Sequence, residues 1–600
     1  MASGSRSIWR LSRRALALLA ALALAMTTAA AELIDPALYG EALAGEDVTG
    51  ETVAAEENYF TSPTINMDAD LRMGYVASSV EEINPLSCTQ RDLVSLNMLV
   101  FESVVELDDN MKPVPLLADS WKKKGNTWTF TLRSGIVFHN GAPLTAEQVV
   151  ASYKRFAQVD KDNPYYSRVA LIKSMESVDD LTLRVTFRGS GYAVLYGMTF
   201  PVIESSTVSD VLPRGTGPYW YTEYYTGIGV RLEANPLWWK NDPEVHSIAA
   251  INYGSPGDAL EALRTNEINI LCTQSSKAAV NRKLSDLTCM DYATNNYEML
   301  IPNLQNSSVM SDIRMRQAVM YALDRASIAE NAYLGMGVQC EVPVNPASWL
   351  YESQSAIYYY SPERALQLLL DCGWKDLTGD GMLNKINDVI LQDLTVHIIT
   401  YNESTNNIRE NAADLVAMYL QQVGINAKVT VYSKTKCLQE MRDYDYDLAL
   451  VGIQLSDLPL LSPLLQARGS LNMNNFRNDN MELLLNEVST AQSEEALRSA
   501  FSQIQMIVVD RLPLLGLLFR TGSVLSKRSL GGLSGLRVGD MLNGIEYMTN
   551  CFGAALLIFV IPASAAKTSR RGNCRNARRC ARRRGSFSSE SRCCAGTPAR

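Results

Sequence analysis

The chain has 600 residues, of which 47% are hydrophobic and 20% are charged, so it has the composition of a globular protein and the length of at least two domains. Its formal net charge is −9, although eleven basic residues and a single acidic one lie between Lys567 and Arg600. The rest of the chain is therefore strongly acidic. This argues against nucleic acid as a partner, because binding to phosphates needs clustered cations on the folded surface.

Residues 1–31 are predicted to be a secretory signal peptide. Basic residues between Arg6 and Arg14 precede an apolar run over 15–26, and Ala29-Ala30-Ala31 offers a cleavage site. A membrane anchor is the alternative, but about twelve apolar residues are too few to span a bilayer comfortably. The first cysteine is Cys88. We therefore expect cleavage near Glu32 without lipid attachment, in a protein exported to the periplasm or to the outer face of the cell membrane.

Residues 32–68 are rich in Ala, Glu, Gly and Thr and lack apolar periodicity, which predicts a flexible leader. Regular structure is expected to begin with a strand over 71–76.

Cysteines are numerous, eleven in all, and those ahead of the basic C-terminal segment have no C-x-x-C spacing, which argues against a zinc cluster. Disulfides in an oxidising compartment and buried free thiols both stay open for them. They are Cys88, Cys272, Cys289, Cys340, Cys372, Cys437 and Cys551.

A strand followed by a helix is predicted between Pro115 and Phe156. Aromatic and aliphatic residues alternate with polar ones over 128–133, which is the period of a half-buried strand. Thr145 and Gln148 have the spacing of a capping box, in which Thr145 accepts a backbone N–H and Gln148 reaches back. The apolar face of the helix is expected to hold Val149, Tyr153 and Phe156.

Three further motif regions follow in order along the chain. The first is R-G-T-G-P-Y at 214–219 with N-P-L-W-W at 235–239. The second is D-I-R-M-R-Q-A at 312–318 with Y-A-L-D-R at 321–325, and the third is S-P-E-R-A at 361–365 with C-G-W at 372–374. Together with the 115–156 module, this colinear set resembles the family 5 extracytoplasmic solute-binding proteins, the peptide- and nickel-binding receptors of ABC importers.

An α/β fold is indicated by the residues themselves further along the chain. Alternating strands over 394–398 and 427–431 flank a helical apolar face between Ile408 and Leu420, with Gly424 at the helix end. Such a unit implies parallel strands and a right-handed crossover. The resemblance implies the type II periplasmic-binding-protein fold, with two main lobes, a hinge near Asn303 and a small inserted lobe.

The resemblance also suggests how the chain is divided. The first lobe is expected to comprise 69–101, 200–303 and 528–552, the inserted small lobe 102–199, and the second main lobe 304–527. Residues 553–600 form an atypical tail, apolar and then basic, for which a short membrane segment with a positive cluster, a disordered end and a frame-shifted reading are the alternatives.

The candidate ligand-binding residues are Asp457, Ser456 and Gln454. In peptide-binding relatives a G-W-x-x-D-x-x-[DE]-P segment places an aspartate against the ammonium group of the peptide. The matching segment here has Ile453 in place of the tryptophan and is one residue short. Asp457 is therefore either the ammonium anchor or the cap of a turn before Pro459.

Enzymatic activity is not expected, because H-E-x-x-H, G-x-x-x-x-G-K-[ST] and G-x-S-x-G motifs are absent and only three histidines are present. No cofactor or metal site is predicted. His139 is expected at the surface or as a cap. The loop from Asp376 to Asn387 resembles a calcium loop but lacks the acidic twelfth ligand, which favours a turn.

The sequence thus predicts a monomeric receptor that captures oligopeptides and delivers them to an ABC permease. A nickel chelate or an oligosaccharide is the alternative ligand. A secreted α/β hydrolase and a surface protein with a basic interaction arm are the rival functions.

Overall fold

The computed structural model describes residues 64–77, 82–282, 284–387, 389–403, 406–527 and 532–548. The predicted signal peptide, most of the leader and the 553–600 tail lie outside these ranges. Within them, no helix has both the length and the apolarity needed to cross a bilayer.

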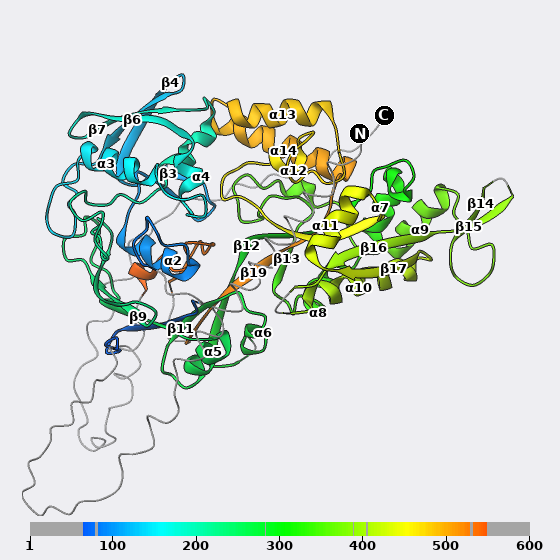
Figure 1. Ribbon diagram of the computed structural model, residues 1–600, viewed down its shortest axis with the longest axis horizontal. Helices are drawn as coiled ribbons and strands as arrows, with labels where there is room; N and C mark the ends of the chain where they lie inside the picture. The colour runs from blue at the N-terminus through cyan, green and yellow to red at the C-terminus, as the bar shows by residue number, and fades with distance from the viewer. Residues whose placement is uncertain are drawn as a thin grey trace, which may run out of the picture. The chain divides into compact units, whose positions relative to one another are not determined.

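One mixed sheet of eleven strands carries the fold (Figure 1). Its strands in spatial order are β17 (Asn426–Tyr432), β16 (Thr395–Tyr401), β18 (Leu448–Gln454), β12 (Leu287–Pro302), β19 (Leu515–Lys527), β11 (Ile270–Thr273), β1 (Leu71–Tyr75), β10 (Ser247–Asn252), β9 (Gly229–Ala234) and β8 (Tyr219–Tyr225), with β13 (Gly337–Gln339) also paired to β19.

The two long strands β12 and β19 pair antiparallel and belong to two hydrophobic cores at once. Tyr297 and Phe519 lie in one core, whereas Tyr292 and Val524 lie in the other. The pairing register shifts between Ala293 and Tyr297, where the strands pass from one core to the other. The strands therefore change core between Ala293 and Tyr297, ahead of the predicted boundary at 303/304. β12 itself continues to Pro302. The domain boundaries themselves stay predictions.

The core that contains Tyr297 holds the predicted strand–helix–strand unit. β16 and β17 are parallel and are joined by α10 (Ile408–Gln422), as expected. Gly424 has φ +84°, a left-handed conformation that suits glycine at a helix end. The other helices of this part are α7 (Ile313–Ala322), α8 (Arg325–Asn331), α9 (Pro362–Asp371), α11 (Lys434–Asp443), α12 (Ser462–Leu465), α13 (Asp479–Thr490) and α14 (Glu494–Arg511).

The core that contains Tyr292 includes α2 (Arg91–Val100) and a separate four-stranded sheet within the predicted inserted lobe (Figure 1). That sheet has the order β4 (Ala118–Lys124), β5 (Thr127–Leu132), β7 (Thr182–Phe187) and β6 (Ile172–Asp179), and it lies with α3 (Ala146–Phe156) and α4 (Tyr166–Val169). The remaining helices, α5 (Pro256–Arg264) and α6 (Ala278–Asn281), pack in a third and smaller core with Leu287 of β12 and Leu525 of β19.

The capping box of α3 is half formed. Thr145 Oγ1 accepts the N–H of Gln148 at 3.4 Å, as predicted. The expectation that Gln148 reaches back was wrong, since its Oε1 accepts the N–H of Ser205 at 2.8 Å instead. A tertiary contact has thus taken the Gln148 side chain away from its local partner. The same contact connects α3 to Ser205, in the predicted second part of the first lobe.

Two other sequence interpretations have clear outcomes. The loop after α9 is a turn, because the carboxylate of Asp376 accepts the N–H groups of Gly379 and Gly381. Within the described ranges, no three potential ligands among His, Cys, Asp and Glu come together as a metal site. The cysteines Cys272, Cys289, Cys340, Cys372 and Cys437 are thiols.

His139 is buried rather than exposed, which corrects the sequence-based expectation. Its Nδ1 accepts the N–H of Gly215 at 3.2 Å, so its proton is on Nε2, which lies 3.3 Å from the carbonyl oxygen of Gly217. This ring holds the 214–219 turn against the end of α2. A Cβ on Gly215 would lie 2.0 Å from the oxygen of Val100, so only glycine fits there.

The burial of His139 predicts a loss of stability in mild acid. Burial lowers the pKa of His139 from 6.5 to about 4. The unfolded chain then binds the proton at a higher pH than the folded chain, so the free energy of unfolding falls as the pH drops from 6.5 to about 4, by up to about 3 kcal/mol. Denaturant titrations across this range should show that His139→Gln removes this slope, whereas His246→Gln, at an exposed histidine, keeps it. Equal slopes in all three proteins would contradict the assignment.

Candidate functional site

A cavity of about 660 Å³ lies beside the 294–296 segment of β12 and the carboxyl end of β18. We call it the polar cavity. Its walls come from both cores: α2 and the loop before α4 on one side, and residues 454–457 on the other, with residues 537–540 completing it. Open α/β sheets bind ligands at the carboxyl ends of strands, and 660 Å³ is within the usual range for a ligand pocket.

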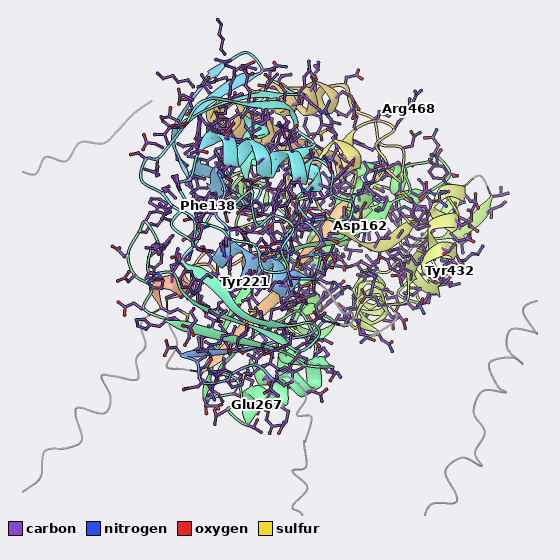
Figure 2. The ribbon with its side chains drawn as sticks, turned by 60° about the vertical axis from the view of Figure 1, so that its left-hand side comes forward. Phe138, Asp162, Tyr221, Glu267, Tyr432 and Arg468 are labelled. Carbon is purple, nitrogen blue, oxygen red and sulfur yellow. The ribbon has the colours of Figure 1, made fainter. Side chains whose placement is uncertain are left out.

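The polar cavity carries both signs of charge. Its cationic lining residues are Arg91, Lys161, Arg168 and Arg537. Its anionic lining residues are Glu106, Asp162, Asp457 and Asp540. Amide side chains also line the cavity, among them those of Asn163, Gln274, Asn295 and Gln454. Figure 2 labels Asp162, one of the anionic lining residues. Such a lining suits a ligand that carries separated charges and several hydrogen-bonding groups.

Burial changes the acidity of two of these carboxyl groups. It raises the pKa of Asp540 above the usual value, although the ion pair with Arg537 opposes this. It also raises the pKa of Glu106, in spite of nearby cations. Arg537 also donates to the carbonyl oxygen of Leu107 at 3.0 Å. This bond connects residues 532–548 to the predicted inserted lobe.

All three sequence-predicted site residues, Gln454, Ser456 and Asp457, line the polar cavity. The Asp457 carboxylate does not cap the turn before Pro459. It forms an ion pair with Arg168 at 3.3 Å and accepts a hydrogen bond from Asn295 Nδ2. Ser456 Oγ accepts the N–H of Leu458 and thus caps that turn. The contribution of these residues to ligand binding stays a prediction.

Arg168 is a residue that the sequence analysis missed. It lies on α4 in the 102–199 segment, almost three hundred positions from Asp457, and no motif marks it. Its Nη1 donates to the carbonyl oxygen and the hydroxyl of Thr199 at 3.1 and 3.2 Å, and its guanidinium lies over the ring of Tyr165. These contacts hold one side of the guanidinium, and Nη2 reaches across the cavity to Asp457.

A second cavity, of about 100 Å³, adjoins the first, and we call it the apolar cavity. Arg168, Asn295 and Asp457 line both cavities and so stand where they meet. The interior is different in character. Its walls include the apolar side chains of Met111, Val344, Leu350, Phe501 and Phe519 and the uncharged polar side chains of Tyr196, Asn345 and Ser348.

Buried ion pairs lie where β12 and β19 enter the core that contains Tyr297, which we call the second core. Glu298, with 1% of its side chain exposed, accepts from Arg409 at 2.9 Å and from Arg520 at 2.6 Å. Glu403 binds both arginines, at 3.1 and 2.9 Å. A Cβ on Gly452 would lie 2.5 Å from Arg409 and from Glu298, which explains glycine at this position of β18.

The comparison with protein families assigns the chain. The model of the bacterial extracellular solute-binding proteins, family 5, middle region, matches residues 112–475, so the chain belongs to this family. It is the substrate-binding receptor of an ABC importer, a class of protein that binds solutes and is not enzymatic.

Proteins similar to this chain are named for different ligands. The oligopeptide-binding protein AppA of Bacillus subtilis is 22% identical over 454 residues, which cover 72% of this chain and 82% of the relative. The heme-binding protein A of Haemophilus influenzae is 24% identical, with 69% and 80% covered. The dipeptide-binding protein of Escherichia coli is also 24% identical, with 63% and 77% covered.

Solved structures show the same fold. AppA of Bacillus subtilis in complex with a nonapeptide matches with a TM-score of 0.52 and 21% identity, covering 80% of this chain and 98% of that one. NikZ of Campylobacter jejuni in complex with Ni(L-His) matches with a TM-score of 0.56 and 21% identity, covering 80% and 99%. The expected type II periplasmic-binding-protein fold is therefore confirmed.

The Glu298 ion pairs predict a large and local effect on stability. Glu298→Ala leaves Arg409 and Arg520 buried with Glu403 as their remaining partner, and breaking a buried pair costs about 3–5 kcal/mol. The matched control is Glu261→Ala, because the Glu261–Arg264 pair is 59% and 61% exposed and such pairs contribute about 1 kcal/mol at most. Denaturant unfolding of both variants measures the difference. A similar small change in both would show that the Glu298 pairs do not stabilise the fold.

Proposed function

We propose that the chain is an exported receptor that captures oligopeptides in the polar cavity, between its two main lobes, and delivers them to an ABC permease. It would act as a monomer in the periplasm or on the outer face of the membrane. The observation that carries the peptide assignment is the Asp457 carboxylate, which stands at the end of β18 within a cavity that holds both charge signs and several amides.

The peptide ammonium is proposed to bind Asp457. The carboxylate already pairs with a cation, Arg168, so a ligand ammonium would take the place of one arm of that guanidinium. Asn295 would keep the carboxylate in position, because its Nδ2 bonds the other oxygen. Ser456 and Gln454 are proposed to contact the peptide backbone next to this anchor, where β18 has ended and its polar groups face the cavity.

Closure is the proposed link between binding and delivery. A ligand that contacts both walls of the polar cavity favours the arrangement in which the walls are closest. The register shift between Ala293 and Tyr297 gives β12 a place at which to bend without disturbing either core. The permease would then receive the closed, loaded form.

Removal of the Asp457 charge tests the peptide assignment. Asp457→Asn should weaken the binding of a free-amine tripeptide by about tenfold to a hundredfold, which corresponds to about 1.4–2.8 kcal/mol. We expect less than for a fully buried pair because 39% of the Asp457 side chain is exposed. Calorimetric titration would measure this, with the N-acetylated tripeptide as the second ligand.

The matched control is Asp510→Asn, the same change at an exposed carboxylate that does not line the described cavities. The control should bind the tripeptide like the wild type. If the wild type binds both forms of the peptide equally, Asp457 is not the ammonium anchor. If it binds neither, a non-peptide solute becomes the better assignment.

A further inference from the structure

The apolar cavity opens beside Asp457 and is large enough for a side chain. Its volume is about 100 Å³, whereas about 10–15 Å³ on the same kind of measure suffices for one water. Leu350, Phe501 and Phe519 in its wall have at most 3% of their surface exposed, so the wall is part of the packed second core.

The charged groups of this cavity are confined to its mouth. Arg168 and Asp457 are paired with each other there, and Asn295 bonds Asp457. Arg537, which also lines the cavity, is paired with Asp540. The interior therefore offers no partner charge to a side chain that enters it.

We propose that the apolar cavity receives the first side chain of the peptide and makes the receptor selective for an aliphatic first residue. This inference rests on the proposed function, because it needs the peptide ammonium at Asp457. An α-amino group and the side chain of the same residue branch from one carbon. An ammonium held at the mouth thus places that side chain at the entrance of the cavity, since Asp457 lines both cavities.

The chemistry of the cavity sets the order of preference. An aliphatic side chain removes apolar surface from water and gains free energy with each methylene group that is buried. Glycine leaves the cavity empty. A charged side chain would have to be desolvated without a partner, which is strongly unfavourable. Leucine or valine should therefore bind best, glycine less well and aspartate or lysine worst.

A panel of tripeptides that differ only in the first residue tests this order by calorimetric titration of the full-length protein. Leu-Ala-Ala should bind at least about tenfold more tightly than Gly-Ala-Ala. Asp-Ala-Ala and Lys-Ala-Ala should bind more weakly than Gly-Ala-Ala. Equal affinities across the panel would overturn the inference while leaving the peptide receptor intact. No binding of any tripeptide would instead count against the proposed function.

A substitution that fills the cavity provides the second test. Leu460 lines the apolar cavity but not the polar cavity and is partly exposed, so Leu460→Phe adds bulk there with limited disturbance of the core. It should lower the affinity for Leu-Ala-Ala about tenfold and leave that for Gly-Ala-Ala nearly unchanged. Leu471→Phe is the matched control, at a similarly exposed leucine outside both cavities, and should change neither. A uniform loss for both peptides in Leu460→Phe would contradict the assignment of this cavity.

Discussion

The antiparallel pairing of β12 with β19 is the constraint on which the rest of the structure depends. These strands are the part of the sheet that both hydrophobic cores share, so a displacement of one core relative to the other must pass through them. The pairing register shifts between Ala293 and Tyr297 and again between Glu298 and Met299. We propose that the joint between the lobes lies at the first of these shifts. Immediately beyond it, Glu298 and its arginine partners link the two strands to α10.

The proposed binding site lies beside the same pair of strands. The 294–296 segment of β12 lines the polar cavity, and the N–H of Leu455 bonds the carbonyl oxygen of Asn295, so the segment that carries Asp457 starts from the joint. Arg168 approaches from the other side, from α4 in the predicted inserted lobe. Its pairing with Asp457 links the two walls, and a ligand ammonium would compete with it. In the proposed mechanism, the affinity for a ligand would therefore depend on how strongly Arg168 and Asp457 hold the two walls together.

Much of the fold could be predicted because its signals are local. The alternation over 128–133 became β5, and the unit around α10 became parallel strands joined by a helix, since burial of one face imposes the period of each element. The segment that contains Asp457 was singled out because its sequence resembles a motif. It lines the cavity because β18 ends at Gln454, and its contribution to ligand binding stays a prediction.

The remaining features could not be predicted because they are set by tertiary contacts. Arg168 acquires its significance from a pairing across almost three hundred residues. His139 was expected at the surface or as a cap because Asn140-Gly141 forms a turn, but packing against the 214–219 turn buries it. Gln148 was drawn away from its helix by Ser205. The position of the proposed joint could not be predicted either, since a register shift within a continuous strand leaves no break in the apolar pattern of the sequence.

Small-angle X-ray scattering with and without ligand tests most directly whether the two lobes close on a peptide. The measurement needs the ligand-free protein, the same protein saturated with a tripeptide whose binding calorimetry has established, and far-ultraviolet circular dichroism of both. Closure of the lobes should give a smaller radius of gyration in the loaded protein with an unchanged dichroism spectrum, because intact lobes move about a joint. An unchanged radius of gyration at saturation would contradict it.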